Sequence, residues 1–154
     1  IMNKVFLILV FLTFSSFLDA KDDLTRQKPI TQIVYFHGTE GEGHYFEPSY
    51  LEFETGKLYK LILKNKSDSK HYFTSKKFAA SIFTRKIQIS IRGEKIAEIK
   101  GNISEVEVFP DNEVEWWFVP IKTGEFNDLE CRIKDKTRSL SHADMGMKGV
   151  IKIY

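Results

Sequence analysis

Two stretches in the second half of the chain alternate apolar and polar residues at period two. They are "ISEVEVF" (103–109) and "EVEWWFV" (113–119), and the turn-forming sequence "PDN" separates them. Alternation at this period places successive side chains on opposite faces, which is typical of half-buried β-strands. We therefore predict two strands here, with Trp117 partly covered and with a core face on the second strand formed by Val114, Trp116 and Phe118.

The rest of the chain also predicts short strands with little helix. Further strand candidates are 30–36, 49–55, 56–65, 71–75, 124–131 and 148–154. The stretch "KKFAASIFTRK" (76–86) is the one predicted helix, and the longer segment 76–102 is predicted to be a helical flap or an excursion over one side. Many short strands with turn signals between them indicate a sandwich or a barrel. The fold class is therefore all-β with a short helical insertion.

The first twenty residues have the pattern of a secretory signal peptide. Lys4 is followed by an almost entirely apolar run from Val5 to Leu18, and Ala20 is a possible cleavage point. We predict a signal peptide over 1–20, a polar lead over 21–29 and a single domain over 30–154. An uncleaved anchor is the alternative for 1–20. If the signal peptide is cleaved, we expect the rest of the chain not to insert stably into a membrane. We then expect it to be located in the periplasm or outside the cell.

Charge excludes one large class of function. Charged residues make up 29% of the chain, and they nearly cancel to a net charge of +2. Nucleic-acid binders usually concentrate basic residues on one face, so this balance argues against such a partner.

The chain contains a single cysteine, Cys131. Exported domains usually carry cysteines in disulfide pairs, so a lone thiol must be buried, linked to another chain or bound to a metal. His142 and Met147 follow on the loop before the last predicted strand, and His71 follows the turn "KNKSDSK". In a sandwich these strand ends can meet at one pole. Two imidazoles, a thiolate and a thioether are the donors of a type 1 copper centre, in which copper cycles between Cu(I) and Cu(II).

The same residues resemble the cupredoxin family, in its plastocyanin-like group of small exported copper proteins. In "TGEFNDLEC…SHADMGMKGVIKIY", a Gly-x-aromatic strand leads to Cys131, and His142 and Met147 have the family's His-x₄-Met spacing. The stretch "YFEPSYLEFETGKLYKLILKN" (45–65) resembles the family's early strands, and His71 lies six residues after Asn65. The resemblance implies a Greek-key β-sandwich that binds one copper ion through His71, Cys131, His142 and Met147.

Two departures from the family pattern stand out. "RIKDKTRSLS" places ten residues between Cys131 and His142, where the family usually has two to four. Loop closure costs only about 0.6 kcal/mol per doubling of length, so the insertion is compatible with a site but is expected to loosen or reshape it. The segment 76–102 is also unusually long.

Several residues have competing interpretations. Met145 offers a shorter spacing from His142 and is the alternative thioether ligand. His37 and His44 flank "HGTEGEGH", which predicts a glycine-rich loop, and we expect them to be solvated rather than to bind a second metal. Each proposed ligand also has a structural alternative, such as an inert buried thiol for Cys131.

We predict a non-enzymatic, exported copper-binding electron carrier, because four protein donors leave no open position for a substrate. The first alternative is a copper chaperone or storage protein with the same ligands, and the second is a metal-free interaction module. The loop between Cys131 and His142 carries four basic residues against Asp135 alone, which predicts an acidic partner, either a redox protein or a copper donor.

Overall fold

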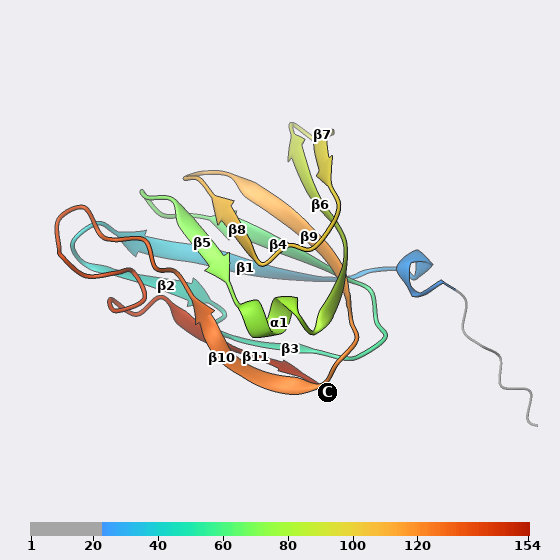
Figure 1. Cartoon of the computed structure of the whole chain (residues 1–154). Helices are drawn as coiled ribbons and strands as arrows, with labels where there is room; N and C mark the ends of the chain where they lie inside the picture. Colours follow the sequence, from blue (N-terminus) through green and yellow to red (C-terminus); the bar gives the residue numbers. More distant parts are fainter. Residues whose placement is uncertain (1–22) are drawn as a thin grey trace, which may run out of the picture.

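Residues 23–154 are described by a computed structural model, and the signal-peptide prediction for 1–20 lies outside them. The eleven strands of these residues form two facing sheets (Figure 1). The six-stranded sheet has the order β2 (Gly43–Glu47), β1 (Ile30–Thr39), β4 (Tyr59–Asn65), β9 (Glu113–Pro120), β6 (Ile82–Ile91) and β7 (Glu94–Ile99). The five-stranded sheet has the order β3 (Tyr50–Phe53), β11 (Lys148–Ile153), β10 (Gly124–Glu130), β5 (His71–Thr74) and β8 (Glu105–Val108).

This arrangement is an all-β sandwich, which confirms the predicted fold class. The chain crosses repeatedly between the two sheets, so β1 pairs with β4 and β3 pairs with β11 in parallel, while the other strand pairs are antiparallel. A short 3₁₀ helix, η1 (Leu24–Arg26), precedes β1. No helix among residues 23–154 has the length and apolar character needed to cross a membrane.

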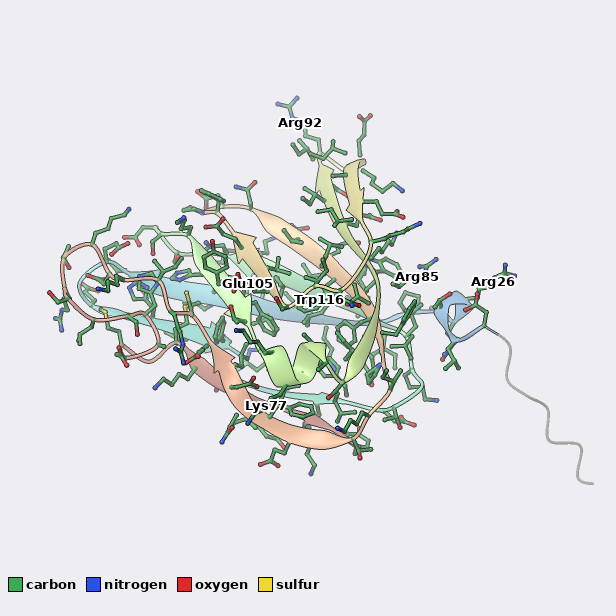
Figure 2. The ribbon with its side chains drawn as sticks, viewed as in Figure 1. Arg26, Lys77, Arg85, Arg92, Glu105 and Trp116 are labelled. Carbon is green, nitrogen blue, oxygen red and sulfur yellow. The ribbon has the colours of Figure 1, made fainter. Side chains whose placement is uncertain are left out.

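Aromatic side chains fill the space between the sheets. Trp116 lies between the two layers, as Figure 2 shows, and it is 1% exposed. Its ring contacts Phe73 of the opposite sheet edge-on, at a centroid distance of 6.3 Å. Val114 and Phe118 are buried beside it, so the predicted core face of β9 is confirmed. Trp117 is half-buried under Lys60, Arg85 and Lys86 on the other face of the sheet, as expected.

The predicted helix over 76–86 is wrong for most of its length. One helical turn, α1 (Lys76–Ala79), begins at Ser75, whose Oγ accepts from Phe78 N. The chain then enters β6, which pairs with β9 from Ile82 to Gln88. The segment 82–91 is rich in β-branched residues, which favour strands, and β9 needs a neighbour on that side.

The segment 76–102, predicted to be a helical flap or an excursion, is not a helical flap. Its second part is the β6–β7 hairpin, which projects from the sandwich and carries Arg92 at its tip (Figures 1 and 2). The local pattern of Phe78, Ala79, Ile82 and Phe83 resembled a helical face, but strand pairing decided the structure.

Candidate metal centre

Three of the sequence-predicted site residues lie where strands of the five-stranded sheet begin or end, and His142 lies on the loop between β10 and β11. His71 opens β5, six residues after Asn65 closes β4. Cys131 follows the last residue of β10, and Met147 precedes the first residue of β11. His71, Cys131, His142 and Met147 are all 0% exposed. The sandwich therefore brings four side chains of three chemical types to one buried pole, although they come from three separate segments.

Three donor atoms form a compact triangle. Cys131 Sγ lies 3.8 Å from His71 Nδ1 and 3.8 Å from His142 Nδ1. The two Nδ1 atoms are 3.0 Å apart. A point in this triangle lies about 2.1 Å from all three atoms, close to the bonds of about 2.0–2.3 Å that imidazole and thiolate form with the first-row ion zinc. The spacing of the three donor atoms is thus close to that of a trigonal site for a first-row metal ion.

The tautomer of His71 leaves its Nδ1 free to bind a metal. His71 Nε2 lies 2.7 Å from Ser67 Oγ. The Ser67 hydroxyl in turn donates within a buried network to Asn65 Oδ1 or to the Ser69 carbonyl oxygen, so its oxygen is available to accept from His71 Nε2–H. Ligand histidines usually donate their second ring nitrogen to such a partner, which fixes the ring orientation.

Asn65 holds the turn that carries this network. Its Nδ2 donates to the carbonyl oxygens of Ser69 and Val108, each at 2.8 Å. Its Oδ1 accepts from Ser67 N at 2.9 Å and from Ser67 Oγ at 2.8 Å. Asn65 is fully buried, so it acts as the support through which β4, β8 and the turn before His71 are held together.

The protonation states suit metal binding. Burial, and secondarily the neighbouring rings of His142 and His44, lowers the pKa of His71 to about 3. Burial also lowers the pKa of His142, so both imidazoles are neutral near pH 7 and keep a lone pair. Burial raises the pKa of the Cys131 thiol, against hydrogen bonds that include Tyr72 N–H to Sγ at 3.3 Å. A bound cation stabilises the thiolate and offsets that cost of burial.

The two methionines of the loop differ in burial. Met147 belongs to the same buried core cluster as Cys131, whereas Met145 is half-buried. The backbone of Met147 is tied to both ligand segments, because its N–H donates to the His142 carbonyl at 2.9 Å and its carbonyl accepts from Cys131 N at 3.2 Å. This placement favours Met147 over Met145 as the thioether donor.

The expected loop between His37 and His44 is shorter than predicted, and the expectation that His44 is solvated is wrong. Strands β1 and β2 extend through most of it, and Gly38 pairs with His44 across the hairpin. His37 is half-buried and its Nε2 lies 2.8 Å from Glu47 Oε2. His44 is 1% exposed, and its ring stacks on that of His142 at a centroid distance of 3.7 Å. A Cβ on Gly38 would lie 2.3 Å from His44 Nδ1, so the glycine opposite His44 was the one local signal of its burial.

Asp135 also differs from expectation. In the sequence it is one acid in a basic loop, but it is 4% exposed, and its carboxylate contacts His44 Nε2 at 3.2 Å. Burial raises its pKa, but hydrogen bonds from Gly41, Thr137 and His44 outweigh that effect and hold the pKa well below its usual range. Asp135 is therefore a buried carboxylate anchor near the site, which the sequence pattern did not show.

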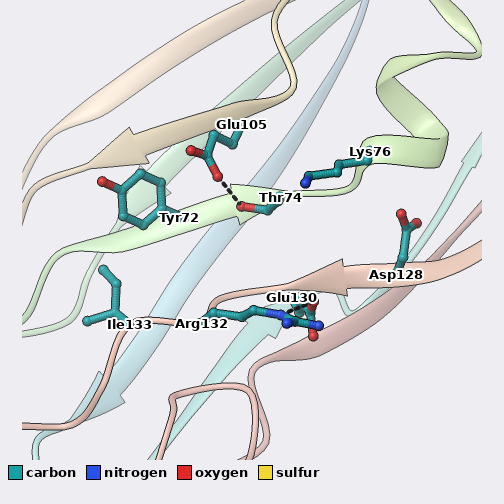
Figure 3. Close-up of a pocket in the computed structure, with 8 residues that line it drawn as sticks. All are labelled: Tyr72, Thr74, Lys76, Glu105, Asp128, Glu130, Arg132 and Ile133. Atoms are coloured by element: carbon teal, nitrogen blue, oxygen red, sulfur yellow. Dashed lines mark hydrogen bonds and ion pairs between the residues drawn. The ribbon is translucent and has the colours of Figure 1, made fainter.

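A groove of ≈ 550 Å³ opens on the Tyr72 side of the centre (Figure 3). Strands β5 and β10 are paired at the single position Glu130–Thr74, and the groove lies where they separate. Thr74 Oγ1 donates to Glu105 Oε2 across one wall, while Arg132 and Ile133 line it beside Cys131. The groove thus lies on the Tyr72 side of the donor cluster, while His71, Cys131, His142 and Met147 themselves stay fully buried.

No protein-family model and no curated protein sequence matches this chain. Solved structures do share its fold. Copper nitrite reductase from Nitrosomonas europaea matches with a TM-score of 0.56 and 13% identity over 87% of this chain and 52% of that one. A Cu-containing nitrite reductase from Thermus scotoductus gives a TM-score of 0.57 and 11% identity, over 85% of this chain and 32% of that one. A laccase from Botrytis aclada gives a TM-score of 0.54 and 10% identity, over 80% of this chain and 28% of that one.

These similarities establish the fold and nothing finer, because the identities are low. The chain spans about half or less of the length of these two nitrite reductases and of the laccase. The fold is the cupredoxin-like β-sandwich that the sequence resemblance implies, and a cluster of His, Cys and Met residues lies at one pole of it.

Proposed function

We propose that this chain binds one copper ion and serves as a type 1 copper electron carrier. The observation that supports the proposal is the buried triangle of His71 Nδ1, His142 Nδ1 and Cys131 Sγ, which fits a first-row ion. A His₂Cys trigonal set with a weak axial thioether is the donor set of blue-copper electron-transfer sites. Export to the periplasm or the cell exterior is part of the proposal and rests on the pattern of residues 1–20.

The chemistry follows from the mixture of donors. Copper in such a site supplies one-electron transfer, because thiolate and thioether suit Cu(I) while imidazole suits Cu(II). The protein's own contribution is to fix the positions of the donor atoms. Ser67 orients the His71 ring, Tyr72 N–H bonds the sulfur, and the Met147 backbone ties the two ligand loops together. A non-enzymatic carrier agrees with four buried protein donors, which leave no position for a substrate.

Copper delivery or storage is the alternative role for the same ligands. The ten-residue insertion suggested a loose site that exchanges metal readily. Instead, the insertion is anchored by the buried Asp135, and the four predicted ligands are fully buried. A closed, anchored site supports the electron carrier over the chaperone, and a metal-free module would not explain the convergence of these donors.

Adding Cu(II) to the purified chain lacking residues 1–20 tests the proposal. We expect an intense visible absorption band from thiolate-to-copper charge transfer. We also expect a higher melting temperature, because a ligand that binds only the folded chain adds about 4 kcal/mol at a thousandfold excess over Kd. Tight Cu(I) binding without the visible band would support the chaperone instead. A melting temperature that does not respond to either copper ion would overturn both.

The basic loop supports an acidic partner, which we propose docks beside Cys131 and His142. Lys134, Lys136 and Arg138 are exposed on this loop. Complementary charge speeds encounters by roughly 10- to 1000-fold and is screened by salt. With hexacyanoferrate(III) as an anionic oxidant of the reduced copper protein, replacement of these three residues by Ser should slow oxidation and flatten its salt dependence.

A matched variant controls for total charge. Replacing Arg92, Lys95 and Lys100 on or beside the β6–β7 hairpin removes the same three charges away from the site. It should change the oxidation rate much less than the loop variant. Equal effects from both triple variants would show that net charge alone acts, and that the loop is only a spacer.

A further inference from the structure

The tip of the β1–β2 hairpin and the ten-residue insertion interlock around His142. Gly41 N donates to Asp135 Oδ2 at 2.7 Å, and Lys136 N donates to Glu40 Oε2 at 2.7 Å. A Cβ on Gly41 would lie 2.6 Å from Thr137 Oγ1, so the two segments are in close contact. Figure 1 shows the hairpin and the insertion side by side at one end of the sandwich. This contact joins residues about 95 positions apart in the chain.

The ring of His44 forms the inner part of this contact. It stacks on His142 with an interplanar angle of 23° and a centroid distance of 3.7 Å. Imidazole lone pairs lie in the ring plane, so two nearly parallel rings direct them alongside each other rather than toward one point. One ring nitrogen of His44 lies within 4.8 Å of ring nitrogens of His71 and His142, which is close enough for an ion to be held among the three. Because its ring is stacked on that of His142, however, His44 is not directed at the position between His71, His142 and Cys131. It is arranged to cover the face of that ring.

Asp135 holds His44 in this position. One carboxylate oxygen, Oδ2, accepts from Gly41 N and from His44 Nε2. The other, Oδ1, accepts from Thr137 N, Thr137 Oγ1 and Arg138 N at 2.7–2.8 Å. The same side chain thus shapes the turn of the insertion and binds the hairpin. The backbone N–H of His44 donates to the Met145 carbonyl at 3.5 Å, which links His44 to the loop before Met147.

We propose that His44 and Asp135 form a latch that closes the His142 side of the site and limits the access of ions and small molecules to Cys131. His44 is a positioning residue in this proposal, not a ligand. The insertion that lengthens the Cys131–His142 connection is the part of the chain that supplies the latch. The latch concerns access to a buried thiol and an imidazole, and its thiol test does not depend on copper.

The metal-free protein gives the first test, because Cys131 is the only thiol in the chain. We expect His44→Ala to raise the rate of Cys131 alkylation by iodoacetamide on the order of tenfold, since losing the buried hydrogen bond to the Asp135 carboxylate favours local opening by about that factor. His44→Phe keeps a flat ring over His142 but loses the bond to Asp135, and its rate should fall between those of the wild type and His44→Ala. Melting temperatures and near-ultraviolet circular dichroism verify that each variant is folded.

His37→Ala is the matched control. His37 lies on the same hairpin, but it is half-buried and bonded to Glu47 rather than to the site. Its variant should react at the wild-type rate. The proposal is overturned if His44→Ala reacts no faster than the wild type, or if His37→Ala accelerates the reaction equally. If His44→Ala does not fold, the comparison of His44→Phe with His37→Ala decides by the same criterion.

A second measurement rests on the proposed copper function. Transfer of Cu(I) from the loaded protein to an excess of a soluble Cu(I) chelator should be faster in His44→Ala, again on the order of tenfold. If the wild type binds no copper while the alkylation result holds, the copper proposal fails and the latch stands. If copper binds through Cys131 and neither rate responds to His44→Ala, the latch fails and the copper proposal stands.

Discussion

Replacement of Cys131 by Ser is expected to abolish the visible copper band and to leave the sandwich folded. The band requires a thiolate bound to copper, and a Ser hydroxyl stays protonated and is a poor ligand for a soft ion. Ser is smaller than Cys but keeps a hydrogen-bond acceptor at the same place, so Tyr72 N–H retains a partner. Absorption spectra during copper titration and the far-ultraviolet circular dichroism of the metal-free protein measure the two parts of this expectation.

The two methionines of the same loop provide graded comparisons. Met147→Leu should keep the visible band but shift its position and the reduction potential, because the axial thioether bond is weak and tunes the centre. Met145→Leu should leave both unchanged, since Met145 is half-buried. The reverse ranking would give the axial role to Met145.

An unaltered spectrum in Cys131→Ser would show that the thiolate is not a ligand.

Replacement of Asn65 by Ala should lower the free energy of unfolding by roughly 2–4 kcal/mol. The side chain makes four hydrogen bonds in a fully buried position, and its loss leaves the Ser69 and Val108 carbonyls and the Ser67 amide without those partners. The turn before His71 should loosen as well, so copper affinity is expected to fall. Urea denaturation of the metal-free protein separates the effect on stability from the effect on binding.

Asn112→Ala is the control for this substitution. Asn112 is exposed, and its side chain donates only to the nearby Pro110 carbonyl. Its replacement should change the free energy of unfolding by less than about 0.5 kcal/mol. If the two alanine variants have the same stability, the buried network around Asn65 does not support the pole in the way that its contacts suggest.

Strand content was predictable because period-two alternation reports directly which side of a strand is buried. The core face of β9, with Trp116 at its centre, is an example. The helix over 76–86 was mispredicted because apolar residues at helical spacing, such as Phe78 and Ile82, can also serve one helical turn followed by a strand. The backbone groups along one edge of β9 needed hydrogen-bond partners, and the ten-residue strand β6 supplies them.

The sequence by itself determined the chemistry of the donors. The order of His71, Cys131, His142 and Met147 was readable because a thiol, two imidazoles and a thioether have definite metal preferences wherever they lie in a chain. Their convergence followed from the expectation that strand ends of a sandwich meet at a pole. The triangle of His71, Cys131 and His142 agrees with that expectation, and their role as ligands stays a prediction until copper is added.

Only the tertiary structure decided how the pole is closed. His44 and Asp135 are 91 residues apart, and nothing in the local pattern of either one indicates the other. Their contact depends on the register of the β1–β2 hairpin, on Gly38 leaving room for the His44 ring, and on the path of the insertion across the hairpin tip. Hydrophobic alternation and residue type predict structure only over a few neighbouring positions. The partners of a buried carboxylate are set only when distant segments pack against each other. The sequence therefore specified a set of candidate donor residues, and the packing of the sandwich determined that a third histidine, His44, stacks on His142 beside them.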